Sequence, residues 1–227
     1  MTKNYFPQLD LEQFWDDDEL ALEEYVDEAP DDLLIASIEN ELGYKLPDSY
    51  IALMKQHNGG IPYATCYPLP EEDEQDDSDY VEITGFLNIG RKKMNSLCGT
   101  AGNKLFKEIW HYPDYGVYIC DCPSAGFDLI LLDYRQCGTD GEPSVAYVNM
   151  ETSQIITLAP DFATFVQGLT EEEELVSLEE DLGADSLAFV ELVIALEDAT
   201  GIHIEEEEAS KLKTVADVLA YLESKQQ

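Results

Sequence analysis

The pattern of apolar and polar positions is clearest between Tyr118 and Val148, where it predicts three β-strands and two connections. The run FDLILLDY (127–134) is apolar at nearly every position, so we expect it to be buried on both faces in the middle of a sheet. YIC and SVAYV are shorter β-branched and aromatic runs on either side of it, and IITL follows as a further strand. Gly, Pro, Ser and Asp mark the two connections as turns, Pro123-Ser124-Ala125-Gly126 and Cys137-Gly138-Thr139-Asp140-Gly141.

Upstream of these strands, apolar residues recur at helical spacing and predict two helices. The first begins at a cap from Asp31 or Asp32 and ends at Gly43. The second begins after Pro47, a residue suited to the first turn of a helix. Their apolar sides consist of Leu34, Ile35, Ile38 and Leu42 in the first helix and of Tyr50, Leu53 and Met54 in the second.

Three more helices and one more strand are predicted from shorter patterns. An acidic start suited to the helix dipole, followed by Leu20, Leu22 and Tyr25, predicts a helix near the N-terminus. The runs KLFKEIW (104–110) and DFATFVQGL (161–169) predict two others. VEITGFLNI (81–89) predicts a single strand, with Gly85 as a bulge.

The composition bounds the class of protein. With 227 residues and 44% hydrophobic residues, the chain can form one large domain or two small ones. It has no apolar run long enough to span a membrane and no basic-then-apolar start typical of a secretory signal, so we expect a cytoplasmic protein. The five cysteines are then expected to be reduced. A metal site from Cys120, Cys122 and Cys137 is the alternative, but CxxC spacing and a histidine pair are missing.

The formal charge of −37 excludes nucleic acid and anionic membrane surfaces as partners, because their phosphates would be repelled. It favours a basic protein partner, although acidity can also serve solubility alone. The densest acidic run is by default a solvated loop and alternatively a contact surface for that partner. Its candidate partner-binding residues are Glu71, Glu72, Asp73, Asp76, Asp77 and Asp79. Arg91, Lys92 and Lys93 form a basic cluster that we interpret as a local counterweight.

The composition shifts to dense acid at TEEEELVSL, which places a boundary near Thr170. We therefore expect a first domain over residues 1–169 and a second over residues 170–227. In the second domain, Asp185 caps a helix that begins at Ser186. Its apolar side is Leu187, Val190, Val193, Ile194 and Leu196. A last helix begins at Thr214, and its apolar side is Val215, Val218, Leu219 and Leu222.

Two long motifs in the first domain resemble the bacterial SUKH (Smi/Knr-like) immunity-protein superfamily. They are IENELGYKLPDSYIALMKQHNGGIP and CDCPSAGFDLILLDYRQCGTDGEPSV, and the resemblance covers about residues 14–169. It implies an α+β fold with a mixed sheet packed by helices. It also implies that the protein neutralises a toxin, so the basic partner would be a protein toxin, for instance a basic nuclease.

The second domain resembles the last three-quarters of an acyl carrier protein, over about residues 172–225. The matching residues are Asp185-Ser186-Leu187 within DLGADSL, followed by ELVIALED, Gly201-Ile202 and TVADVLAYL. The resemblance implies a small all-α module with 4′-phosphopantetheine on Ser186, loaded by a phosphopantetheinyl transferase and read by acyl-transfer enzymes. A helix start suits such a phosphodiester. The first carrier helix is either absent or supplied by residues 161–169.

No catalytic set is evident in the sequence, so we expect a protein that is not an enzyme. The three histidines lie far apart, and none stands in a nucleophile motif. We interpret His57 as a residue that bonds carbonyls at a helix end. Three hypotheses remain: an immunity protein with a carrier-like tail, an acyl carrier with a partner-recruiting domain, and a regulatory interaction protein.

Overall fold

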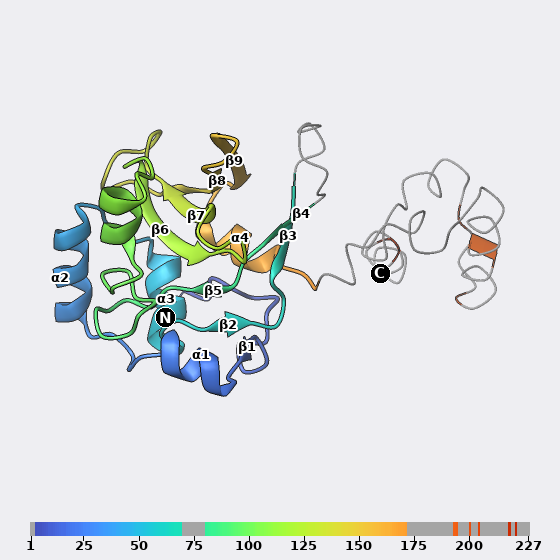
Figure 1. Cartoon of the computed structure of the whole chain (residues 1–227). Coiled ribbons are helices and arrows are strands. Elements are labelled where there is room, and N and C mark those ends of the chain that lie inside the picture. Colours follow the sequence, from blue (N-terminus) through green and yellow to red (C-terminus); the bar gives the residue numbers. More distant parts are fainter. Residues whose placement is uncertain are drawn as a thin grey trace. The chain divides into compact units, whose positions relative to one another are not determined.

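Figure 1 shows the computed structural model of the chain. It describes residues 3–69 and 80–171, followed by Val193, Ile194, Thr200, Ile204, Val218 and Tyr221. The contacts between residues divide the chain into two compact units, Met1–Leu169 and Thr170–Gln227.

The first unit is built on a five-stranded sheet in the order β5-β6-β7-β8-β9. Its strands are β5 (Gly85–Phe86), β6 (Gly116–Asp121), β7 (Asp128–Asp133), β8 (Ser144–Asn149) and β9 (Gln154–Ala159). β7 lies in the middle and is buried from Leu129 to Asp133, as its continuous apolar run predicts. All four pairings are antiparallel. The α+β class is therefore confirmed, but the sheet is antiparallel rather than mixed.

Two pairs of short strands complete the sheets, β1 (Trp15–Asp16) with β2 (Ile61–Pro62) and β3 (Cys66–Pro68) with β4 (Tyr80–Glu82). The single strand predicted over residues 81–89 is therefore wrong, because β4 pairs with β3 whereas β5 pairs with β6. The chain changes sheets at Thr84, whose N–H donates to the carbonyl of Asp121 at 2.8 Å. Gly85 begins β5 rather than forming a bulge, and a Cβ there would lie 2.7 Å from the Tyr25 ring.

Helices α2 (Asp32–Leu42), α3 (Asp48–Gln56) and α4 (Phe162–Gln167) follow the predicted boundaries. The Asp31 carboxylate accepts a hydrogen bond from the Leu34 N–H at 2.7 Å, which caps α2. Gly43 ends α2 with φ of +78°. The Asp161 carboxylate caps α4 in the same way through the Thr164 N–H, at 2.8 Å. Side-chain caps thus fix the starts of α2 and α4, and α3 begins directly after Pro47.

Helix α1 (Glu19–Glu24) forms as predicted, and Ala21 and Tyr25 make its buried side. Leu20 and Leu22 are 52% and 46% exposed, whereas Ala21 and Tyr25 are buried. The Asp18 cap and a 2.8 Å hydrogen bond from the Tyr25 hydroxyl to Asp121 fix the rotation of the helix. Because Ala21 and Tyr25 are four residues apart, they share one helix face, and the two leucines lie on either side of it.

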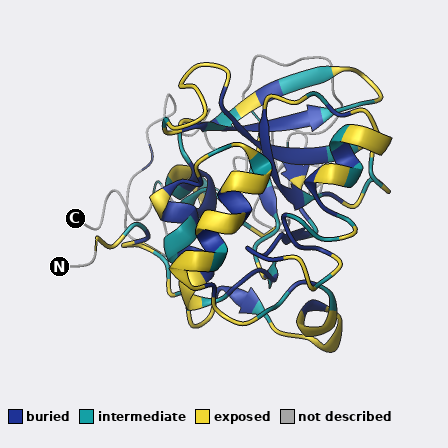
Figure 2. Ribbon diagram, turned by 90° about the vertical axis from the view of Figure 1, so that its left-hand side faces the viewer, coloured by how far each residue is buried: buried dark blue, intermediate teal, exposed yellow. Residues whose placement is uncertain are grey.

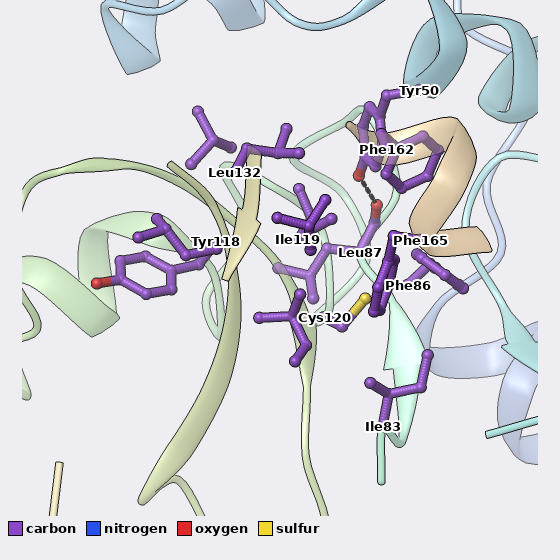
Figure 3. Packing of buried hydrophobic residues seen from close by; sticks show 14 of the residues in the cluster. Tyr50, Ile83, Phe86, Leu87, Tyr118, Ile119, Cys120, Leu132, Phe162 and Phe165 are labelled. Atoms are coloured by element: carbon purple, nitrogen blue, oxygen red, sulfur yellow. Dashed lines mark hydrogen bonds between the residues drawn. The ribbon is translucent and has the colours of Figure 1, made fainter. Parts of the chain in front are cut away.

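The two faces of the five-stranded sheet are covered by different elements. Tyr118 of β6 packs against Phe106, which lies in the π-helix η1 (Leu105–Ile109), and against Tyr112, which follows this helix. The short helix predicted over residues 104–110 is therefore confirmed, in π form. Figure 3 shows Tyr118 pointing away from the opposite cluster, where Phe86, Phe162 and Phe165 meet.

Burial follows this layering, as Figure 2 shows: the strands of the main sheet are largely buried, and the helices expose their outer sides. Arg135 lies beyond β7 and binds the carboxylate of Asp133 at 2.6 Å. All five cysteines are free thiols. Among the described residues, no helix has the length and apolar character needed to cross a membrane.

In the second unit, the described positions Val193, Ile194, Thr200, Val218 and Tyr221 are helical. Val218 and Ile204 are buried, and Val218 was predicted to lie on the apolar side of its helix. Ile194 is 52% exposed, so its assignment to an apolar side is wrong. Phe162, Phe165 and Val166 of α4 belong to the hydrophobic core of the first unit.

Candidate functional site

A cleft of about 390 Å³ lies where β6 ends, β7 begins and β8 ends. Because these strands are antiparallel, the end of β6, the start of β7 and the end of β8 lie at the same end of the sheet. β4 closes the cleft from the side. Residues that line it include Tyr80, Glu82, Cys122, Ser124, Asp128 and Tyr147.

The turn between β6 and β7 forms one wall of the cleft. Ala125 and Gly126 have φ values of +56° and +92°, which allow the chain to reverse direction here. The Ser124 hydroxyl accepts a hydrogen bond from the Asp128 N–H at 2.8 Å. The Tyr112 hydroxyl donates to the Gly126 carbonyl at 3.0 Å. These bonds tie both ends of the turn to the domain.

Carboxylates dominate the electrostatics of the cleft. Burial raises the pKa of the Cys122 thiol well above its ordinary value, and the nearby carboxylates of Asp121, Asp128 and Glu82 raise it further. Burial also raises the pKa of the Tyr147 hydroxyl, which accepts a 3.1 Å hydrogen bond from Asn149 and is influenced by Asp128. Both groups therefore stay protonated at neutral pH, and the charge of the cleft is negative.

Exposed aromatic side chains lie near the same turn. Phe127 is 55% exposed, and Trp110 is 39% exposed. The Trp110 ring packs over Gly126, where a Cβ would lie 2.7 Å from the ring. The neighbouring Ile109 is 64% exposed. Large aromatic residues are enriched in protein–protein interfaces, where they often serve as anchors.

The predicted partner-binding residues Glu71, Glu72, Asp73, Asp76, Asp77 and Asp79 lie outside the described residues. The structure does place the segment on either side of them: Leu69 and Tyr80 both line the cleft. Sequence reasoning missed the cleft itself. Its acidic residues, Glu82 and Asp128, are 46 positions apart in the sequence and lie on strands of two different sheets, β4 and β7.

The described residues offer little for metal binding or nucleophilic catalysis. No group of three or more His, Cys, Asp or Glu side chains in the described part of the chain is arranged to hold a metal ion. Burial raises the pKa of Cys120 well above its ordinary value, so its thiol is a poor nucleophile.

His57 lies at the end of α3 and beside a second hollow in the surface. Its ring nitrogens lie 2.7 Å from the Gly59 carbonyl and 3.0 Å from the Asp17 carboxylate. The ring stacks on Trp15 with a centroid distance of 4.7 Å. These contacts join β1 to α3. His57 lies at the helix end as predicted, but the carbonyl that it contacts belongs to Gly59, beyond the helix.

The first unit is thus an α+β domain with an acidic cleft at one end of the inner strands of an antiparallel sheet. The SMI1/KNR4 family (SUKH-1) model matches residues 29–168. The chain belongs to this family. The match supports an immunity-protein family for the first unit, as the two long motifs imply.

The second unit matches a different model, that of the phosphopantetheine attachment site, over residues 168–222. Acyl carrier proteins are similar to it: that of Exiguobacterium sp. is 57% identical over 49 residues and that of Helicobacter hepaticus 62% identical over 45 residues. These matches cover 22% and 20% of this chain. The chain spans 62% and 59% of the length of these two relatives.

The matches support a carrier-like tail with 4′-phosphopantetheine on a serine. The predicted attachment residue Ser186 and its neighbours Asp185 and Leu187 lie outside the described residues. Their assignment therefore rests on the sequence of the DSL motif.

Proposed function

We propose that the first unit is an immunity protein that neutralises a basic protein toxin by direct contact and catalyses no reaction. Family membership supports this role. The reason for proposing a basic partner is the distribution of charged side chains in the first unit. Of the nine Lys and Arg residues in the described part of the chain, eight contact a carboxylate or a backbone carbonyl of the first unit. The ninth, Lys3, lies over the Tyr5 ring.

The basic cluster illustrates how these cations are used. Arg91 pairs with Glu41 at 2.7 Å, and Lys92 lies 3.9 Å from Asp27. The Lys93 ammonium donates to the carbonyls of Leu22 and Glu23, at the end of α1. All three cations of the cluster thus bind groups of the first unit itself. The carboxylates that have no such cation nearby give the surface a negative charge, which attracts a basic partner. A nuclease toxin would fit, because an acidic surface can occupy a cleft built for phosphates.

Binding to the product of the toxin gene beside this protein's gene tests the proposal. Isothermal titration calorimetry should show a complex whose affinity falls as salt is raised. Reversing the charges of Asp76, Asp77 and Asp79 to lysine should weaken it. The control reverses Glu12, Glu19 and Glu23, three carboxylates of the N-terminal region. An absence of binding by the wild-type protein would contradict the proposed function, and equal binding by both variants would exclude the acidic segment.

We further propose that Ser186 carries 4′-phosphopantetheine, whose thiol holds acyl groups as thioesters. The similarity to acyl carrier proteins, 57% and 62% in the two relatives above, supports this second role. Asp185 and Leu187 would complete the motif that a phosphopantetheinyl transferase reads. On the alternative reading, the protein is principally an acyl carrier and the first unit recruits a partner enzyme.

Intact mass after co-expression with a phosphopantetheinyl transferase tests the modification. The wild-type protein should gain the mass of one phosphopantetheinyl group, and Ser186→Ala should gain none. Ser177→Ala, a second serine of the same unit, is the matched control and should be modified like the wild type. An unmodified wild-type protein, or a Ser186→Ala variant that still gains the mass, would exclude this assignment.

A further inference from the structure

We propose that an exposed apolar patch, formed by Ile109, Trp110 and Phe127, is the surface on which the toxin docks. The inference deepens the proposed function and rests on it for the identity of the partner, a basic protein. It assigns the contact to the end of η1 and to the turn between β6 and β7. It also gives the chemistry of the toxin's contact surface, which is apolar with basic residues around it.

Three large apolar side chains are exposed close to one another in this patch. The exposed fractions are 64% for Ile109, 39% for Trp110 and 55% for Phe127. The Trp110 ring lies on Gly126, the residue before Phe127, where a Cβ would come within 2.7 Å of the ring. Two segments that are distant in the sequence thus form one surface. Single exposed apolar residues are ordinary, whereas a contiguous group of them marks an interaction site.

The patch is held in place by contacts with the interior of the first unit. The Trp110 ring packs on the buried Phe106 ring at a centroid distance of 5.5 Å. The Phe127 carbonyl accepts a 2.8 Å hydrogen bond from the Met150 N–H. A surface that is ordered before binding loses little conformational entropy when a partner docks on it. These contacts therefore favour use of the patch as an anchor.

The backbone on both sides of the patch adopts an uncommon conformation. His111 directly follows Trp110 and has φ of +61°, and Ala125 in the turn has φ of +56°. They are two of the three non-glycine residues with positive φ in the described part of the chain. Such a conformation is unfavourable for a residue with a side chain and persists where surrounding contacts hold it, often at binding sites. The fold thus maintains strained backbone where it presents the patch.

Charge on the turn side of the patch is negative. Residues 112–134, which include the turn and Phe127, contain no Lys, Arg or His, and neither do residues 136–169. The exposed Glu151 follows Met150, whose N–H binds the Phe127 carbonyl. A carboxylate therefore lies near the patch on this side, in a part of the chain that supplies no cation.

On the η1 side of the patch, cations and carboxylates occur together. Glu108, whose side chain is 63% exposed, precedes Ile109. Lys104 lies 4.0 Å from Glu108, and the Lys107 ammonium binds the Asp114 carboxylate at 2.5 Å. Each of these two cations thus faces a carboxylate, so the η1 side adds no net positive charge.

This distribution of charge decides between two kinds of occupant. A second copy of the chain would bring the same carboxylates and a formal charge of −37 against the patch, and it would be repelled. A basic protein would place its cations opposite the carboxylates while its apolar side chains cover the patch. Apolar anchors inside a charged rim are the usual arrangement of a protein interface.

Calorimetric titration with the toxin encoded beside this gene tests the patch by substitution. Phe127→Ala and Ile109→Ala should each weaken binding at least about fivefold, because each removes an apolar anchor. Both side chains are more than half exposed, so the urea midpoint of the variants should equal that of the wild type. Leu33→Ala is the matched control: it removes an 82% exposed side chain from α2 and should change the affinity less than about twofold.

A second measurement needs no substitution at an anchor. The chain has two tryptophans, Trp15, which is 7% exposed, and Trp110, which is 39% exposed. Protein labelled with 5-fluorotryptophan gives one ¹⁹F NMR signal for each, and Trp110→Phe identifies the signal of Trp110. Binding of unlabelled toxin should shift the Trp110 signal and remove its difference between H₂O and D₂O. The Trp15 signal should stay in place.

The outcomes separate the inference from the proposed function. A complex in which the Trp110 signal is unmoved, or in which both patch variants bind like the wild type, would overturn the inference and leave the proposed function standing. A Trp110 signal that moves with the concentration of the labelled protein alone would show that a second copy covers the patch, which also overturns it. A toxin that does not bind the wild-type protein would refute the proposed function and, with it, the docking.

Discussion

At the scale of single residues, buried asparagines hold the long connection between β5 and β6. Asn103 is almost fully buried, and its amide closes three hydrogen bonds. Its oxygen accepts from the Tyr118 N–H at 2.8 Å, and its nitrogen donates to the carbonyls of Leu97 and Tyr118 at 3.1 and 3.0 Å. Asn58 makes a similar set with Glu28 and Ile89. Side-chain amides thus replace the strand pairing that this irregular segment lacks.

Asn103→Ala should destabilise the first unit by about 2–4 kcal/mol, because it leaves buried backbone groups without partners. Urea unfolding followed by tryptophan fluorescence measures the change, since both tryptophans, Trp15 and Trp110, belong to this unit. Asn40→Ala, on the exposed side of α2, is the control and should change stability by less than about 0.5 kcal/mol. A loss at Asn103 no greater than at Asn40 would contradict the role of the amide.

Asp121 is a second residue whose environment makes a measurable prediction. Burial raises its pKa from 3.8 to about 6, although the hydrogen bond from Tyr25 opposes the shift. One carboxylate oxygen is buried without a hydrogen-bond partner in the structure. Because the folded-state pKa is the higher one, the folded state binds more protons between these values. The stability that Asp121 contributes is therefore complete below about pH 3.8 and is lost as pH rises through about 6.

Asp121→Asn should consequently stabilise the protein relative to wild type at pH 7.5 more than at pH 5. The asparagine oxygen can still accept the Tyr25 hydroxyl hydrogen, and the cost of burying a charge disappears. The gain at pH 7.5 should be at most about 3 kcal/mol, the equivalent of the pKa shift. Urea unfolding at both pH values measures the difference, and Asp140→Asn at an exposed turn serves as control. A gain that is the same at pH 5 and pH 7.5 would contradict the prediction.

At the scale of elements, sequence predicts best where the signal is local. The caps at Asp31 and Asp161 and the stop at Gly43 depend on neighbouring residues, and the structure has them as predicted. The continuous apolar run of β7 likewise predicts that both faces of this strand are buried, as they are. Each of these signals lies within the element that it defines.

Sequence fails where distant contacts decide. Residues 81–89 read as one strand, yet hydrogen bonds from Ile83 to Thr65 and from Thr84 to Asp121 divide it between two sheets. The sequence does not tell which of Leu20, Leu22 and Tyr25 is buried, because the hydrogen bond from Tyr25 to the distant Asp121 decides the rotation of α1. The cleft combines Glu82, Asp128 and Tyr147 from three strands, so no sequence spacing reveals it. Only the acidic character of the candidate site could be predicted from the sequence.

The connection from α3 to β2 shows how closely such elements pack. Gly59 has φ of +83°, and a Cβ there would lie 2.6 Å from the Tyr25 carbonyl oxygen and 2.7 Å from Asn88 Cβ. Gly59→Ala should therefore cost more than the left-handed backbone alone, which is about 1–2 kcal/mol for a residue with a side chain. Gly138→Ala isolates that backbone cost, because Gly138 has φ of +71° and no atom within 4 Å of its Cβ position. Similar losses in the two variants, measured by urea unfolding, would show that the contacts at Gly59 relax freely.

At the scale of the whole molecule, charge sets the conditions under which the fold persists. The chain has 49 acidic and 12 basic residues, and its described ion pairs are mostly at the surface. Such pairs contribute about 0–1 kcal/mol each, whereas the unpaired carboxylates repel one another in the compact state. An acidic surface that suits a basic partner therefore lowers the stability of the free protein.

Salt should accordingly stabilise the free protein. Raising NaCl from about 10 mM to 0.1 M shortens the screening length from about 30 Å to 10 Å, which weakens long-range repulsion between carboxylates more than it weakens close pairs. The urea midpoint should rise over this range; urea is used because it is uncharged and does not itself screen. Replacing Glu12, Glu19, Glu23 and Glu151 by glutamine should reduce the rise. A midpoint that falls with salt would mean that the ion pairs outweigh the repulsion, and the same salt that weakens toxin binding would then also weaken the fold.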